Sequence, residues 1–188
     1  MVVGLAWMAY PGAWAKSTLT VQQRITRTVL AYQPKKGEGY AKIVAYEICK
    51  ASAEHRIDPL IPTSVAIIES GFTMVSKPQL GMFQFTRSTW RSLYGVRGWK
   101  ALSLTDNIRA GVDYLARHYW GTTKRNDRGT YYSLSARSAY SLPVDYGFLR
   151  RALGRYNGCG VHGAYVKKVL NVYKNLKRST VPKARGSR

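Results

Sequence analysis

The pattern of apolar and polar residues along the chain predicts a helical protein. Apolar residues recur at the three- and four-residue spacing of one helix face, and no long alternation typical of strands is present. Helices are expected at residues 17–32, 40–55, 62–70, 86–94, 105–120, 146–155 and 164–176. Residues 131–142 give no clear pattern. The sequence therefore predicts a compact, mainly α domain.

Turn and cap residues delimit these segments. Glycine and proline predict a turn or linker at residues 33–39. Gly71 is expected to end the third helix, and Thr86 and Thr105 are expected to cap the next two. Asp106 would then lie in a first helical turn, where the helix dipole favours a negative charge.

The length of 188 residues fits one domain with short extensions. We expect a main domain at residues 40–176, preceded by an apolar segment, a helix and a linker within residues 1–39. Residues 177–188 are basic and almost without apolar side chains, which predicts a mobile tail. Met1–Ala9 is apolar and Ala13-Trp14-Ala15 suits a signal peptidase, but no basic residues precede it. A signal peptide and an apolar segment docked on the domain both remain open.

The charge is strongly positive. Thirty Lys and Arg against nine Asp and Glu give a net charge of +21. Such a chain attracts polyanions, namely nucleic acid, anionic lipid, teichoic acid or the acidic peptides of a bacterial wall, although charge can also serve solubility alone. The two cysteines and three histidines have no metal-ligand spacing, so no metal or other cofactor is expected. Cys49 and Cys159 could form a disulfide in an exported protein or remain as two buried thiols.

One carboxylate occupies an unusual position. Glu69 lies at the edge of a helical stripe of apolar residues, formed by Ile61, Val65, Ile68 and Phe72. Partial desolvation favours the neutral carboxyl and raises its pKa. A carboxyl that stays protonated near neutral pH can give its proton to a leaving oxygen, as glycosidic cleavage requires. The alternative is a helix-end glutamate paired with one of the many cations.

Four motifs around this glutamate resemble those of the soluble lytic transglycosylases, relatives of the goose-type lysozymes. Residues 57–72 resemble the Glu-Ser motif of that family, and residues 76–84 resemble its Ser…Gly-Leu-Met-Gln motif. Residues 106–115 resemble its Asn-Ile-x-x-Gly-x-x-Tyr-Leu helix, and residues 155–158 its Ala-Tyr-Asn-x-Gly motif. The last helix of the family is echoed by Tyr165, Val169 and Tyr173. The chain departs from the family pattern at Leu80, Phe83 and Arg155, among others.

The resemblance implies a lysozyme-like fold that cleaves bacterial peptidoglycan. Glu69 would serve as acid and then as base, and the hydroxyl of Tyr156 would hold its carboxyl. Gln84, Ser76 and Asn157 would line the sugar site. The alternatives are a packed aromatic for Tyr156, a surface position for Gln84, a local turn for Ser76, and for Asn157 a cap of the turn at residues 158–160. Gly111 is expected to allow close packing.

Two other acids could supply the second carboxylate of an inverting hydrolase, Asp106 and Asp113. Asp106 is better explained by the start of its helix, and Asp113 by a solvated helix face. The reaction that the resemblance implies is transglycosylation, which needs only one carboxylate. The competing interpretations are a muramidase that uses water, and a basic nucleic-acid-binding or virion protein with an inactive lysozyme-like domain.

The expected partners follow from the same resemblance. They are glycan strands, anionic wall polymers on the basic surface, and partner proteins of a secretion machine or virion, with nucleic acid bound only non-specifically. The expected location is the periplasm or cell envelope, or a virion.

Overall fold

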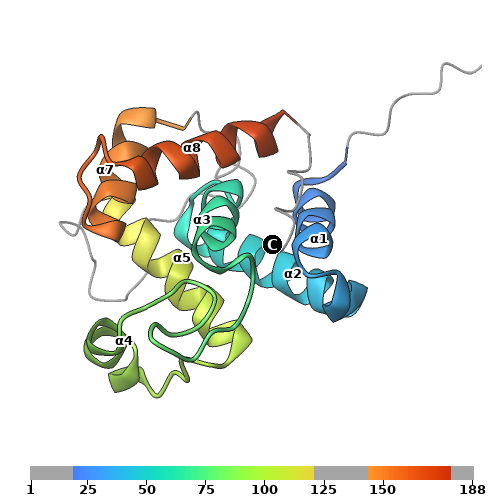
Figure 1. The fold of residues 1–188 in the computed structure, drawn as a ribbon, viewed down its shortest axis with the longest axis horizontal. Helices are drawn as coiled ribbons and strands as arrows, with labels where there is room; N and C mark the ends of the chain where they lie inside the picture. Colours follow the sequence, from blue (N-terminus) through green and yellow to red (C-terminus); the bar gives the residue numbers. More distant parts are fainter. Residues whose placement is uncertain (1–18, 121–143, 179–188) are drawn as a thin grey trace, which may run out of the picture.

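The computed structural model describes residues 19–120 and 144–178 and is mainly helical, which confirms the predicted fold class (Figure 1). In the described residues there is no strand, and only an isolated antiparallel bridge joins Leu80 and Phe85. The α-helices are α1 (Val21–Tyr32), α2 (Gly37–His55), α3 (Leu60–Ser70), α4 (Arg87–Leu93), α5 (Leu104–Trp120), α7 (Tyr146–Asn157) and α8 (Ala164–Lys177). Two short 3₁₀ helices are η1 (Pro34–Lys36) and η2 (Gly95–Arg97).

Helix α3 lies at the centre of the domain, with α8 packed along it and α1, α2 and α5 also touching it (Figure 1). Its first eight residues, Leu60 to Ile67, are all buried, which is the pattern of a helix surrounded by protein. Thr63 and Ser64 can be buried because their hydroxyls donate to the carbonyls of Pro59 and Leu60, at 2.7 and 2.6 Å.

Helices α2, α5 and α7 form a second group of packed helices, in which α5 lies against both neighbours. Helix α1 packs on α2, and its Ile25 and Val29 are fully buried in the common core. Arg24 of α1 also donates to the carbonyl of Leu176 in α8 at 2.8 Å. Residues 19–39 therefore share the core of the following residues instead of forming a separate unit.

The predicted ends of the helices agree with the structure in two cases and differ in two. Gly71 ends α3 with φ +57°, a conformation that glycine adopts easily, and Thr86 caps α4 by accepting from the N–H of Thr89. Helix α5 begins at Leu104, so Thr105 is not its cap. The hydroxyl of Ser103 accepts from the N–H of Asp106 instead, at 3.3 Å. The linker expected at residues 33–39 contains η1 and the start of α2.

Several expectations lie outside the described residues. These are the signal-like segment, residues 131–142 and the tail after Arg178. No helix in the described ranges is long and apolar enough to cross a membrane. Both cysteines lie in the described residues and are not joined by a disulfide. Cys49 is half-buried, and Cys159 is exposed. Neither the disulfide nor the pair of buried thiols is therefore found.

Candidate active site

Glu69 lies where the buried helix α3 reaches the surface. Ile68, Glu69 and Ser70 are half-buried, in contrast to the eight buried residues before them. Ser70 donates its hydroxyl to the carbonyl of Met82 at 2.8 Å. This bond links the end of α3 to the loop that carries Gln84. The motif at residues 57–72 and the motif at residues 76–84 therefore lie together.

The carboxyl of Glu69 is bonded to a tyrosine from the far end of the chain. Tyr165, in the first turn of α8, donates its hydroxyl to Oε1 of Glu69 at 2.6 Å. Burial raises the pKa of Glu69, and the bond from Tyr165 lowers it in part. Burial, aided by the nearby Tyr156 and Glu69, also raises the pKa of Tyr165, so this phenol stays protonated and remains a donor. The raised pKa predicted for Glu69 is confirmed in direction.

Tyr156 does not hold the carboxyl of Glu69, contrary to expectation. Its hydroxyl donates to the carbonyl of Phe83 at 2.6 Å, and a phenol has only one proton to give. Its ring instead lies nearly parallel to that of Tyr165, with 6.4 Å between the ring centres and 10° between the planes. Burial and then the charge of Glu69 raise the pKa of Tyr156. Tyr156 thus borders the carboxyl and links α7 to the loop.

The loop at residues 79–85 is held by one buried amide. Asn107, in α5, accepts from the N–H of Phe83 at 3.2 Å and donates to the carbonyl of Ala101 at 3.0 Å. Its amide also reaches the carbonyl of Leu80 at 3.5 Å. Asn107 is fully buried, so its bonds to the loop are shielded from water. The sequence did not single out Asn107 or the role of Tyr165, because neither belongs to a pattern that reveals what its side chain touches.

The three residues expected to bind sugar occupy different surroundings. Gln84 is half-buried and adjoins Phe83, and its amide donates to the carbonyl of Gly81 at 2.6 Å. Asn157 is the exposed last residue of α7, next to Tyr156. Ser76 is exposed in the preceding loop, where its carbonyl accepts from Arg87 at 3.3 Å. Asn157 therefore adjoins Tyr156, which borders Glu69, and Gln84 adjoins Phe83, whose carbonyl accepts from Tyr156. No contact ties Ser76 to these residues.

Asp113 is not on a solvated helix face, contrary to expectation. Its side chain is buried, with 5% of the residue exposed. Its carboxylate accepts from Arg117 at 2.7 Å and from the hydroxyl of Tyr94 at 3.0 Å. Asp106 lies in the first turn of α5, as predicted, and accepts from the N–H of Lys100 at 3.0 Å. Both acids are therefore engaged away from Glu69 in structural contacts.

Within residues 19–120 and 144–178, no group of three or more His, Cys, Asp or Glu could hold a metal ion. The groups that the structure places near Glu69 are instead the phenols of Tyr165 and Tyr156. Among the described residues, no second carboxylate is close enough to Glu69 to contribute to its pKa. The arrangement can therefore offer and take back one proton at a single carboxyl group.

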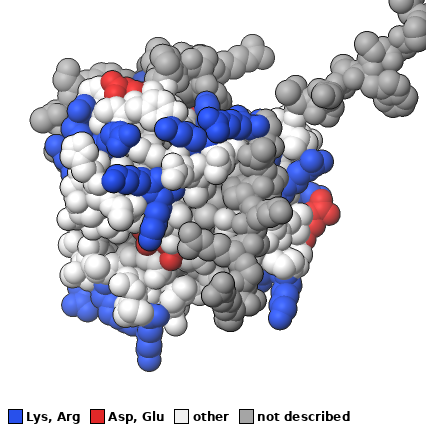
Figure 2. All heavy atoms as spheres, turned by 45° about the horizontal axis from the view of Figure 1, so that its top comes forward, with Lys and Arg blue, Asp and Glu red and all other residues white. Residues whose placement is uncertain are grey.

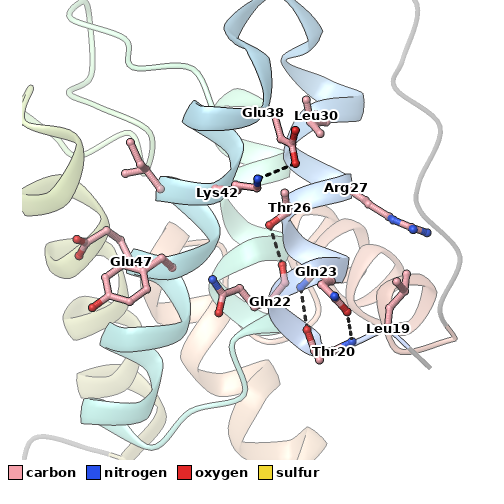
Figure 3. Close-up of a pocket in the computed structure, with 12 residues that line it drawn as sticks. Leu19, Thr20, Gln22, Gln23, Thr26, Arg27, Leu30, Glu38, Lys42 and Glu47 are labelled. Carbon is pink, nitrogen blue, oxygen red and sulfur yellow. Dashed lines mark hydrogen bonds and ion pairs between the residues drawn. The ribbon is translucent and has the colours of Figure 1, made fainter. Parts of the chain in front are cut away.

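A hollow of about 920 Å³ lies elsewhere, between α1 and α2 (Figure 3). None of the five predicted site residues lines it. Of its two carboxylates, Glu38 is exposed and paired with Lys42 at 2.9 Å, and Glu47 lies 3.6 Å from Arg109. Both carboxylates are thus engaged with cations, and chemistry is better sought at Glu69.

No family model, curated protein or solved structure matches the chain. The interpretation of the site therefore rests on its residues and their geometry.

The bond between Tyr165 and Glu69 makes a direct prediction. Tyr165→Phe removes the only described hydrogen bond that lowers the pKa of Glu69, so the pKa should rise further above its usual range. Titration of the ¹³C-labelled glutamate carboxyls by NMR would measure this shift. Tyr173→Phe is the matched control, because its hydroxyl donates to Asp58 and leaves Glu69 untouched. An unchanged pKa in Tyr165→Phe would contradict the bond.

Proposed function

We propose that this protein is a peptidoglycan lytic transglycosylase that cleaves the β-1,4 bond between N-acetylmuramic acid and N-acetylglucosamine. The observation that carries the proposal is the state of Glu69. It is a half-buried carboxyl whose pKa is raised by burial, it is bonded to a protonated tyrosine, and no other described carboxylate contributes to its pKa. The order of the four motifs around it supports the same reaction, through their resemblance to that family.

In the first step Glu69 acts as the acid. Its proton passes to the glycosidic oxygen as the bond from that oxygen to C1 of the muramic acid breaks, and charge develops on the sugar ring. A carboxyl with a raised pKa is still protonated at a pH where an ordinary glutamate is ionised. Tyr165 keeps its hydrogen bond to Oε1 and stabilises the carboxylate that the transfer leaves behind.

In the second step Glu69 acts as the base. The carboxylate takes the proton of the C6 hydroxyl of the same muramic acid, and the oxygen attacks C1. The product is a 1,6-anhydromuramoyl end, and Glu69 regains its proton without consuming water. In this proposal Gln84, next to Phe83, and Asn157, next to Tyr156, bond sugar hydroxyls and acetamido groups through their amides.

Hydrolysis of the same bond is less well supported. An inverting enzyme needs a second free carboxylate about 6.5–9.5 Å from the acid to activate water. Asp113 is neutralised by Arg117, and Asp106 is bonded to the backbone of Lys100. The route with one carboxylate agrees best with these pairings. Since peptidoglycan lies outside the cytoplasmic membrane, the reaction also requires that the protein reach the cell envelope or be carried there in a virion.

The products of digestion test the proposal. Purified peptidoglycan treated with the wild-type protein should give fragments that end in 1,6-anhydromuramic acid, identified by mass spectrometry. Each such end is lighter than a reducing end by one water molecule, about 18 Da by stoichiometry of the proposed step. Reducing ends would establish a hydrolase instead. The absence of any cleavage would refute both enzymatic interpretations and favour a binding or structural role.

A further inference from the structure

The hollow between α1 and α2 is formally neutral, in contrast to the chain as a whole. The chain carries a net charge of +21, and Figure 2 shows a face on which Lys and Arg side chains are numerous and acidic atoms are few. The hollow is lined by two cations, Arg27 and Lys42. It is also lined by two of the nine acids of the chain, Glu38 and Glu47. Because these charges balance, a neutral ligand suits this site better than a polyanion such as nucleic acid or teichoic acid.

The α2 side of the hollow presents an exposed aromatic ring. Tyr46 is 51% exposed, although a tyrosine usually buries most of its ring. Ile43, one turn earlier on the same face of α2, is also 51% exposed. Both side chains line the hollow. An aromatic ring with a hydroxyl at its tip offers an apolar surface and a polar end, and the C–H face of a sugar ring can pack on such a surface.

The α1 side of the hollow supplies amide groups. Gln22 and Gln23 both line it, and Figure 3 shows Gln22 directed from α1 toward α2. The side-chain amide of Gln22 takes no part in the hydrogen bonds between described residues. Gln23 uses only its oxygen, which accepts from the N–H of Thr20 at 2.9 Å. Amides that can donate and accept match the hydroxyl and acetamido groups of a sugar.

Glu47 adds an acceptor that is not fully used. Its Oε2 lies 3.6 Å from Nε of Arg109, and no described residue gives this oxygen a hydrogen bond. The side chain of Glu47 is only 12% exposed, so water satisfies little of it. A buried polar atom without a partner costs free energy, and a ligand that brings a donor removes that cost. The hydroxyl of a bound sugar is such a donor.

Hydrogen bonds connect both helices of the hollow to the end of α3, which carries Glu69. Gln33, directly after α1, donates to the carbonyl of Gly71 at 2.7 Å. Tyr40, in α2, donates to the carbonyl of Phe72 at 2.7 Å. Gly71 and Phe72 follow Glu69 by two and three residues. A strand held in the hollow would therefore be anchored to the same folded unit as the candidate acid.

We propose that the hollow between α1 and α2 is a second glycan site, which binds N-acetylhexosamine units of the strand away from the bond that is cleaved. This inference rests on the proposed function for the identity of the sugar. Tyr46 packs on a face of one sugar, Gln22 bonds its acetamido group, and Glu47 accepts from a hydroxyl. The volume of about 920 Å³ is in the range of ligand sites and leaves room for more than one sugar unit.

An NMR titration with a short sugar tests this inference. The probe is the β-1,4-linked tetramer of N-acetylglucosamine. The protein is the ¹⁵N-labelled full chain with Glu69→Gln, in which the proposed acid is removed so that the probe stays intact. Backbone amides of α1 and α2 around the hollow should shift as the probe is added. Cellotetraose has the same linkage without acetamido groups and should bind there about tenfold more weakly, the loss expected for one hydrogen-bonded group.

Two single variants test the contacts separately. Tyr46 and Gln22 are both exposed, so Tyr46→Ala and Gln22→Ala should keep the fold. Each should raise the Kd of the tetramer at the hollow about tenfold, as for loss of a central contact. Tyr146→Ala is the matched control, because Tyr146 is 43% exposed in α7 and does not line the hollow. It should leave this Kd unchanged.

Three outcomes would overturn the inference. Amide shifts confined to the residues around Glu69 would mean that the hollow binds no sugar. An equal loss of affinity in Tyr146→Ala would mean that the ring of Tyr46 makes no specific contact. Shifts of the α1 and α2 amides with protein concentration alone, abolished by Tyr46→Ala, would assign the hollow to contact between two copies of the chain.

The same titration separates this inference from the proposed function, because it does not depend on cleavage. Shifts at α1 and α2 that Tyr46→Ala removes would support the second site even if the wild type cleaves no peptidoglycan. Cleavage by the wild type with no shift at α1 or α2 would support the proposed function and overturn the inference.

Discussion

Replacement of Glu69 by Gln is expected to lower kcat for glycan cleavage by about 10⁴-fold, the upper end for loss of a general acid and base. Gln has almost the same shape and keeps an oxygen that can accept from Tyr165. It has no acidic proton to give to the glycosidic oxygen and cannot take one from the C6 hydroxyl. The release of anhydromuramoyl ends over time measures the loss.

The same substitution at an exposed glutamate is the matched control. Glu54 is exposed in α2, and Glu54→Gln makes the same chemical substitution at a surface site. It should leave kcat within about twofold of wild type, because surface charges at a distance contribute little at physiological salt. Full activity in Glu69→Gln would refute both the acid and the base role of this residue.

A stability measurement shows that lost activity does not come from unfolding. Burial raises the folded pKa of Glu69 above its ordinary value of 4.5, so the native state binds this proton more tightly than the unfolded state. The stability linked to this proton is complete below pH 4.5 and is lost as the pH rises through the folded pKa. Gln does not ionise. Urea unfolding should therefore find Glu69→Gln more stable than wild type above the folded pKa, and similar to it near pH 4.

The helices and the acid could be predicted because their signals are local. A helix face repeats within a few residues, and Glu69 lies inside the segment whose apolar stripe reveals its surroundings. The partner of Glu69 is 96 residues away in the chain, at Tyr165. Tyr156, nine residues earlier, has the same chemistry, and only the packing of α7 and α8 decides which hydroxyl reaches the carboxyl.

The error at Asp113 has a related cause. An acidic residue on an amphipathic helix is usually solvated, and that expectation holds unless cations and hydroxyls converge on it. Arg117 is one turn away, which the sequence does show, but Tyr94 comes from the loop region after α4. Burial of the carboxylate depends on that distant contact, so the spacing along α5 alone could not predict it.

Gly111→Ala is expected to lower the free energy of unfolding by about 3 kcal/mol, the upper end for overpacking a well-packed core. A Cβ on Gly111 would overlap the ring of Phe83, which is fully buried against this point of α5. The ring cannot easily retreat. The N–H of Phe83 is bonded to Asn107 and its carbonyl accepts from Tyr156. Urea unfolding measures the loss, which should also lower Tm by roughly 10 °C.

A glycine in open surroundings gives the matched control. Gly39, in the first turn of α2, has no atom within 4 Å of where a Cβ would be, and Gly39→Ala should stabilise by about 0.5–1 kcal/mol. Phe83→Leu then tests the cause of the loss at Gly111. If the overlap is responsible, the double variant Gly111→Ala/Phe83→Leu should lose less free energy of unfolding than the two single variants together, by about 1 kcal/mol or more. If the two losses of unfolding free energy simply add, the loss in Gly111→Ala does not come from the overlap with Phe83. Because Phe83 adjoins Gln84 and accepts from Tyr156, the overlap should also reduce kcat/KM below the melting temperature.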